Sequence, residues 1–265
     1  MYLLAIETTG PSGSAALLDE EGNVLACEVS EEQMSHLKKL MPMIQSLLTQ
    51  TGVSKQEISY VAPSIGPGSF TGIRIGVSTA RALCQGLELT YGIPVPTLEG
   101  FLYKEEARRQ SAQGNIVCAI INARRGQVYG VVDGFMKPGS YMLNEVLTVI
   151  QENILTPQNI IGGENSKSPK VIFFGDGVDA YEAKIKETLG EENLHKTYEF
   201  AEKSIRYQDA ASVGMWALAN GLRDGKQTEA AVPYQQMLPD YMRKAEAEEK
   251  LAKGQLPICR GPKQE

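Results

Sequence analysis

The sequence is poor in histidine and lacks the short patterns that place a nucleophile or a metal in a hydrolase. Its two histidines, His36 and His195, lie far apart. A helical metal pair that began at His36 would need its second ligand at position 40, which is Leu40. No Cys-x-x-Cys, His-Glu-x-x-His or Gly-x-Ser-x-Gly pattern occurs. We therefore expect no metal site and no catalytic residue.

An excess of positive charge and a long apolar run are also missing. The net charge is -6 and the pI about 5.2, so the surface repels phosphate backbones and unaided nucleic-acid binding is not expected. No apolar run reaches the roughly 18 residues of a membrane span. The chain meets Glu7 almost at once and has no basic leader. These features predict a cytoplasmic protein without membrane contact.

The four cysteines form no close pair in the sequence. Cys27, Cys84 and Cys118 sit in apolar stretches, and Cys259 lies near the end. This distribution predicts reduced cysteines, the first three of them in the core.

The pattern that is present is α/β. In the first half, apolar runs bounded by turns predict strands at Tyr2–Ile6, Ser14–Leu18, Val24–Val29, Tyr60–Ser64 and Pro94–Leu98. The first three, joined by short turns, predict an antiparallel meander. Apolar residues at three- and four-residue steps predict a helix over Leu37–Leu48, with Pro42 inside it, and a second helix runs to about Leu87.

The pattern then begins again. Strands are predicted at Ile116–Ile121, Gln127–Asp133, Val146–Ile150 and Val171–Phe174, and helices at Val178–Leu189 and Asp209–Gly221. The repetition predicts two duplicated α/β domains, each opening with a strand meander, at residues 1–105 and 106–230, followed by a tail at 231–265. In the tail, Arg243–Lys253 is of mixed charge, which is typical of a solvated helix or a docking segment.

The glycine-rich segment Gly66–Gly72, Gly-Pro-Gly-Ser-Phe-Thr-Gly, lies between a predicted strand and a predicted helix. Helix N-termini attract anions, but no Gly-Lys-Ser/Thr follows, so this is not a P-loop. We favour a turn that lets the next helix pack tightly. Gly72, Gly76, Ala80 and Cys84 give that helix a face of small residues, suited to close approach by another helix. The pattern leaves open whether that neighbour belongs to this chain or to another subunit.

Two further turns have the composition of nucleotide-contacting loops. Glu7-Thr8-Thr9-Gly10 ends the first strand, and Gly175-Asp176-Gly177 follows Phe174. A carboxylate, hydroxyls and glycines suit a metal-bound phosphate, yet capped turns use the same residues. On its own the pattern at Glu7 favours a capped turn.

Four blocks of the sequence resemble the TsaB (YeaZ) family, within the actin-like ATPase (ASKHA) superfamily that the opening Leu-Ala-Ile-Glu-Thr-Thr also resembles. Gly66–Arg74 is similar to the family's GPGSFTGxR signature, and Asn122–Tyr129 to its D-A-R-x-G-x-V-Y. Ser35-His36-Leu37 through Pro42 and Pro239–Arg243 match two weaker blocks. Glu7 and Asn122 stand where the family usually has aspartate, which lowers the expectation of nucleotide chemistry.

The resemblance implies an actin-like fold of two duplicated βββαβαβα-type domains, the second of them smaller and degenerate. It also implies a non-catalytic subunit that supports a catalytic TsaD-type paralogue, together with a TsaE-type ATPase, in transferring threonylcarbamoyl to N6 of the adenosine 3′ of the anticodon in tRNA. ATP and metal are then expected on the partners, and tRNA contact through the complex. The family's pairing surface also serves homodimers, and whether this chain is a homodimer or a monomer when alone stays open. The family's pairing surface corresponds to the helices at about Glu32–Leu48 and Thr71–Leu87. The expected interface residues are His36, Leu37, Leu40, Met41, Ile44, Gly72, Ile73, Gly76, Val77, Ala80 and Cys84.

Two other functions are weighed against this one. An active small-metabolite kinase of the same superfamily predicts ATP binding at a working nucleotide loop formed by Glu7, Thr8, Thr9, Gly175, Asp176 and Gly177, whereas the partner-subunit hypothesis makes that loop vestigial. A glycoprotease-like peptidase is the more remote alternative, because the sequence supplies neither a nucleophile nor a metal pair.

Overall fold

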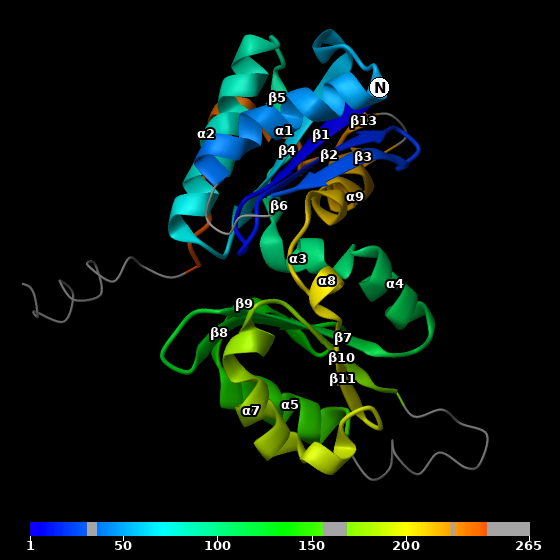
Figure 1. The fold of residues 1–265 in the computed structure, drawn as a ribbon, viewed down its shortest axis with the longest axis vertical. Coiled ribbons are helices and arrows are strands. Elements are labelled where there is room, and N and C mark those ends of the chain that lie inside the picture. The colour runs from blue at the N-terminus through cyan, green and yellow to red at the C-terminus, as the bar shows by residue number, and fades with distance from the viewer. Residues whose placement is uncertain (31–35, 156–168, 224–225, 243–265) are drawn as a thin grey trace, which may run out of the picture.

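The computed structural model describes residues 1–30, 36–155, 169–223 and 226–242, with the side chains of residues 36–38 outside that description. Two β-sheets lie one above the other, with helices between them and on their outer faces (Figure 1). The predicted segment Arg243–Lys253 and Cys259 lie outside the described residues.

The first sheet has the strand order β3-β2-β1-β4-β6. Its first three strands form the predicted antiparallel meander, and β4 and β6 add in parallel beyond β1. The strands are β1 (Tyr2–Glu7), β2 (Ser14–Asp19), β3 (Val24–Val29), β4 (Ile58–Gly66) and β6 (Val95–Pro96). The predicted strand at Pro94–Leu98 is therefore shorter than expected, because Thr97 already begins helix α3 (Thr97–Leu102).

Helices cover both faces of this sheet. On one face lie α1 (His36–Thr51) and α2 (Phe70–Gly86), side by side at the top of Figure 1. Their apolar residues share a core with Leu4, Ile6 and Ala15. Helix α1 continues through Pro42. The opposite face is covered by α9 (Ala210–Gly221), whose Trp216 and Ala217 pack on the other side of the same strands.

The second sheet repeats the first. Its order is β11-β10-β7-β8-β9, again an antiparallel meander with two parallel strands added beyond its first member. The strands are β7 (Ile116–Asn122), β8 (Gln127–Val132), β9 (Met136–Met142), β10 (Val171–Phe174) and β11 (Tyr198–Phe200). The order matches strand for strand, which confirms the duplicated α/β, actin-like architecture.

Helices α5 (Leu143–Asn153) and α7 (Gly177–Leu189) cover the outer face of the second sheet. The predicted strand at Val146–Ile150 is wrong, because these residues lie inside α5. Leu143, Val146, Leu147 and Ile150 are buried at three- and four-residue steps, which is helical spacing. The inner face packs against α3 and α4 (Glu105–Ala112), so these two helices connect the sheets.

The chain crosses between the two halves twice, which corrects the predicted domain boundaries. After α8 (Lys203–Arg206) it returns to the first half, where α9 packs on β1 and β2. The predicted second domain at 106–230 therefore ends near Arg206. The remaining short elements are β5 (Tyr91–Gly92), β12 (Leu222–Arg223), β13 (Lys226–Gln227), β14 (Val232–Pro233) and 3-10 turns at Lys55–Glu57, Glu191–Asn193 and Tyr234–Gln236.

Candidate functional site

The turn Glu7–Gly10 at the end of β1 is sealed inside the protein. Glu7 and Thr8 are fully buried and Thr9 is 3% exposed. The backbone N–H of Thr9 donates to the Glu7 carboxylate, which makes this the capped turn that the pattern favoured. Burial raises the pKa of Glu7 above its ordinary value, because water no longer stabilises the charged form.

The hydroxyl groups near this turn bond to one another and to the backbone. Thr8 Oγ1 donates to the carbonyl oxygen of Gly72 at 2.7 Å. The Ser64 and Thr97 hydroxyl oxygens lie 2.7 Å apart, and Thr97 reaches Thr9 Oγ1 at 3.4 Å. The threonine hydroxyls that would contact a phosphate in a working nucleotide loop thus have hydrogen-bond partners inside the fold.

The glycine-rich loop closes over the turn. The Ser69 N–H donates to the carbonyl oxygen of Thr9 at 2.8 Å, and Ser69 Oγ accepts from the Gly72 N–H at the start of α2. A Cβ atom on Gly68 would lie 2.6 Å from the same Thr9 oxygen, and one on Gly72 would overlap the carbonyl oxygen of Thr8. The glycines therefore allow the close helix packing that we favoured for this segment.

The small-residue face of α2 is directed at its own chain, which answers the question that the sequence left open. A Cβ on Gly76 would collide with the Thr8 hydroxyl. Ile73, Val77, Ala80 and Cys84 are all buried in the core that α2 shares with β1 and α1. The expectation that Gly72, Ile73, Gly76, Val77, Ala80 and Cys84 contact a partner is corrected, because strand β1 and the neighbouring core already occupy that face.

The expected interface residues on α1 divide in the same way. Leu40 is 1% and Ile44 is 3% exposed, so both belong to the core. Met41 is 50% exposed and faces outward. His36 and Leu37 begin the helix, but their side chains lie outside the described residues. Of the residues predicted on α1, Met41 is thus placed by the structure where a partner can reach it.

The outward faces of the two helices form a stripe that the sequence reading missed. On α2, small and polar side chains are exposed at three- and four-residue steps: Thr71, Arg74, Ser78, Ala82 and Gln85. On α1, Met41, Pro42 and Gln45 are exposed. We call these eight residues the outer helix face. The sequence contains a signal for this face, because Ser78 and Ala82 are small and lie four residues apart. The glycines at positions 72 and 76 favoured the opposite face of the helix instead.

At the start of α2, side chains of the Gly66–Arg74 block contact the Pro239–Arg243 block. We call the contact between Phe70, Arg74 and Tyr241 the Arg74 clamp. The Phe70 and Tyr241 rings stack with their centroids 4.7 Å apart, and the Arg74 guanidinium lies 4.0 Å from the centre of the Phe70 ring. Arg74 Nε also donates to the Tyr241 hydroxyl at 2.9 Å. The N–H of Asp240 donates to the carbonyl oxygen of Ile65 at 2.8 Å. The segment that leads into the tail is thereby fixed beside the outer helix face.

The corresponding turn of the second half is also packed against backbone. Gly175 has φ +92° and approaches the Ile120 carbonyl so closely that a Cβ would overlap it. Asp176 accepts from the N–H of Asn122 at 3.1 Å, and burial raises the pKa of its carboxyl. The Asn122 side chain in turn accepts from the N–H of Arg124 at 2.8 Å. Asn122 and Asp176 thus join the end of β7 to the turn after β10 by a hydrogen bond.

Residues 206–208, where the chain returns to the first half, contact both the Gly175–Gly177 turn and the Glu7–Gly10 turn. The carbonyl oxygen of Arg206 accepts from the N–H of Gly175 at 2.9 Å. Two residues later the Gln208 amide presses on Gly10, where a Cβ would lie 2.9 Å from Gln208 Oε1. Among the described residues, the Gln208 amide and the second carboxylate oxygen of Glu7 are buried and have no hydrogen-bond partner. These contacts leave the Glu7–Gly10 turn covered by the chain's own groups.

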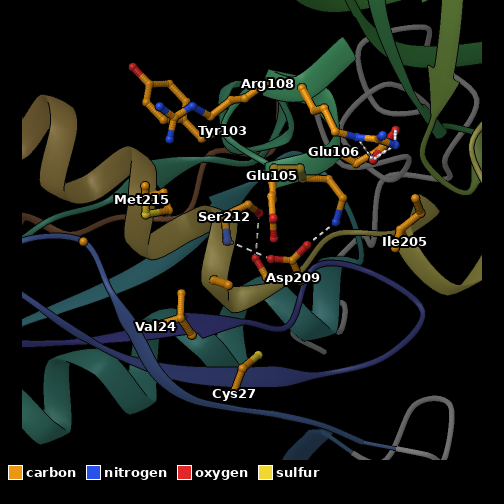
Figure 2. Close-up of a pocket in the computed structure, with 14 residues that line it drawn as sticks. Val24, Cys27, Tyr103, Glu105, Glu106, Arg108, Ile205, Asp209, Ser212 and Met215 are labelled. Atoms are coloured by element: carbon orange, nitrogen blue, oxygen red, sulfur yellow. Dashed lines mark hydrogen bonds and ion pairs between the residues drawn. The ribbon is translucent and has the colours of Figure 1, made fainter. Parts of the chain in front are cut away.

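A pocket of about 850 Å³ lies to one side, between β3, α4 and α9 (Figure 2). Lys104, which is 6% exposed, makes an ion pair with Asp209 inside it, and Asp209 also accepts from the Ser212 N–H at the start of α9. Val24 and Cys27 of β3 form the wall opposite the charged groups. The prediction that Cys27 lies in the core was wrong: it is exposed, because β3 has no strand on its other side among the described residues. Neither nucleotide-like turn lines this pocket. Among the described residues no cluster of three His, Cys, Asp or Glu side chains has the arrangement of a metal site.

Comparison with known proteins assigns the family. A family model described as TsaD: tRNA N6-adenosine threonylcarbamoyltransferase matches residues 24–251. The tRNA threonylcarbamoyladenosine biosynthesis protein TsaB of Bacillus subtilis (strain 168) is 30% identical over 260 residues, covering 96% of this chain and 100% of that protein. The chain belongs to the TsaB family.

Two further relatives support this assignment. The TsaB protein of Escherichia coli (strain K12) is 40% identical over 134 residues, which are 49% of this chain and 53% of that protein. The solved structure of YeaZ from Pseudomonas aeruginosa superposes with a TM-score of 0.61 at 22% identity, covering 91% of this chain and 99% of that one. At 22% identity, the similarity to the YeaZ structure shows the fold alone. In the described part of the chain no helix is long and apolar enough to cross a bilayer.

Proposed function

We propose that this TsaB-family chain is a non-catalytic subunit in tRNA threonylcarbamoyladenosine biosynthesis, and that it acts by binding a catalytic TsaD-type paralogue. The observation that carries this proposal is the sealed Glu7–Gly10 turn beside an open outer helix face. The turn where a superfamily enzyme would hold phosphate is buried, and the Thr8 hydroxyl and one Glu7 carboxylate oxygen bond to this chain's own backbone. The two helices on the same sheet expose a stripe that a second pair of helices can pack against.

The outer helix face suits a helical partner. Ser78 and Ala82 lie four residues apart on α2, and their small side chains let a facing helix approach closely. Met41 adds an exposed apolar side chain from α1, and Phe70, 44% exposed, adds another at the start of α2. Apolar side chains at the centre of an interface, ringed by polar ones, carry most of its binding energy.

The remaining expectations belong to the same proposal. ATP and metal would reside on the TsaD-type subunit and on a TsaE-type ATPase, and tRNA would meet this chain through the complex. Its net charge of -6 agrees with indirect contact, because a protein that holds RNA by itself needs a basic surface. We expect the complex to work in the cytoplasm. An active metabolite kinase stays the alternative, and calorimetry with Mg-ATP tests it: saturable binding would favour it over the partner role.

A point substitution tests the docking surface directly. Ala82→Arg places a long charged side chain on the exposed stripe, so affinity for the TsaD-type paralogue should fall by about tenfold or more, equivalent to about 1.4 kcal/mol. Ala180→Arg, on the exposed side of α7 in the second half, is the matched control and should leave affinity unchanged. Both variants should keep the parent's melting temperature. Equal affinity of Ala82→Arg and the parent would place the interface elsewhere.

A further inference from the structure

The turn between β7 and β8 has a backbone conformation that its residues do not favour. Arg124, Arg125 and Gly126 follow one another with φ of +66°, +54° and +77°. Left-handed backbone suits glycine, and hairpin turns with two such residues in sequence usually carry Asn-Gly or Asp-Gly. In the described part of the chain this is the one place where two neighbouring non-glycine residues both have positive φ. The two arginines therefore cost free energy that asparagine and glycine would not.

The surrounding structure holds this turn in place. The Arg124 N–H donates to Asn122 Oδ1 at 2.8 Å, and the Gln127 N–H donates to the carbonyl oxygen of Arg124 at 3.0 Å. The Gly126 N–H donates to the hydroxyl oxygen of Tyr181, on α7, at 3.1 Å. A strained turn that its neighbours fix in one conformation is typical of a functional site.

The Arg124 side chain is available to a ligand. It is exposed, and its guanidinium takes part in no hydrogen bond, ion pair or ring contact with the described residues. A guanidinium is charged at any physiological pH, and its N–H donors form a planar fork that matches two oxygens of one phosphate or carboxylate. The turn therefore presents a cation whose donors are free for an anionic group with paired oxygens.

The turn lies close to the start of α2. Phe70 and Arg74 hold Tyr241 there, in the Arg74 clamp. The next residue, Met242, packs against the core cluster that contains Ile121, the second-last residue of β7. Two consecutive residues thus reach from the start of α2 to the end of β7, a distance of about 4 Å between their Cα atoms. A substrate that a partner holds beside the outer helix face can therefore reach the turn.

We propose that Arg124 contacts a phosphate group of the tRNA backbone when the complex with the TsaD-type paralogue holds its substrate. This inference rests on the proposed function and adds a residue of this chain to substrate binding. A single exposed guanidinium suits the backbone, because phosphate contacts position a nucleic acid without carrying sequence information. One cation on a chain of net charge -6 does not hold RNA alone, so the contact adds to binding that the paralogue supplies.

The salt dependence of tRNA binding tests the contact. Fluorescence anisotropy with an unmodified tRNA transcript measures the Kd of the paralogue complex between about 50 and 200 mM salt. Arg124→Asn should raise this Kd by about three- to tenfold at low salt and flatten the slope of log K against log salt by about 1, since one phosphate contact is lost. Arg223→Asn, at an exposed arginine of β12 that also has no described partner, is the matched control and should change neither. An unchanged Kd and slope for Arg124→Asn would overturn the proposal.

Thermal unfolding separates a contact with RNA from a role in the fold. Asparagine tolerates positive φ better than arginine does, so Arg124→Asn should raise the melting temperature by about 2–4 °C while it weakens tRNA binding. Arg124→Lys keeps the charge and loses the fork of donors, so it should keep the salt slope and recover part of the affinity. A lower melting temperature for Arg124→Asn would assign the residue to the fold and overturn the proposal.

Affinity for the paralogue without tRNA separates this inference from the proposed function. Arg124→Asn should bind the paralogue as tightly as the parent does. Weaker binding would mean that Arg124 contacts a carboxylate of the partner, which would overturn the RNA contact. A parent chain that does not bind the paralogue would refute the proposed function and this inference together. A parent complex that binds tRNA no better than the Arg124→Asn complex would refute this inference alone.

Discussion

The two faces of α2 are both lined with small residues, yet they do different work. The inner face, with Gly72 and Gly76, lies against β1 and leaves no room for a methyl group. The outer face, with Ser78 and Ala82, meets solvent. The comparison teaches that small residues at helical spacing mark a close approach without naming the neighbour. On α2 the inner contact is internal, and the outer one is available to a partner.

The largest effect is expected from filling the inner face. Gly72→Ala places a methyl group against the carbonyl oxygen of Thr8, and backbone cannot move aside as a flexible side chain can. We expect the free energy of unfolding to fall by about 3 kcal/mol or more. Gly86→Ala, at the open end of the same helix where a Cβ meets nothing, should gain about 0.5–1 kcal/mol. Urea denaturation measures the free energy of unfolding of both variants. Equal losses for Gly72→Ala and Gly86→Ala would contradict the difference between the two positions.

Neutralising the buried acid should stabilise the protein. The folded-state pKa of Glu7 is raised above its unfolded value near 4.5. The protonated carboxyl therefore makes its full contribution to stability below the unfolded pKa, and this contribution is lost as the pH rises through the folded-state pKa. Glu7→Gln should therefore add about 1–3 kcal/mol at pH 7, the cost of a buried and incompletely bonded group, and nothing near pH 4. Thermal unfolding between pH 4 and 7 measures this gap in stability between Glu7→Gln and the parent. A gap that widens toward acid would show that Glu7 is stabilised as a carboxylate.

A smaller loss is expected at the Arg74 clamp. Arg74→Ala removes a hydrogen bond and a cation–π contact at an exposed site, so the free energy of unfolding should fall by about 1–2 kcal/mol. Tyr241→Phe keeps the ring stack and loses one hydrogen bond, so its loss should be about 1 kcal/mol or less. If Arg74→Ala left the melting curve unchanged, the clamp would have no role in holding the segment after Asp240.

Local pattern predicted much of the fold and little of the site. The meander β1–β3 and helix α2 follow from apolar runs, turns and periodicity, as the structure confirms. Val146–Ile150 was read as a strand because the window was too short to show the helical step from Leu143. The packing of α9 on the first sheet is a long-range contact that no local pattern contains. The inward direction of Gly72 and the covering of Gly10 by Gln208 depend on tertiary structure in the same way.

Reconstituted tRNA modification with two variants tests the central claim most directly. The assay combines tRNA, threonylcarbamoyl adenylate as the donor, the TsaD-type paralogue, the TsaE-type ATPase and this chain, which is the parent, Glu7→Gln or Ala82→Arg. The account predicts full threonylcarbamoylation of tRNA with Glu7→Gln, because the sealed turn takes no part in chemistry, and a large loss with Ala82→Arg, because the outer helix face holds the partner. Loss of modification with a folded, partner-bound Glu7→Gln, together with normal activity of Ala82→Arg, would contradict it.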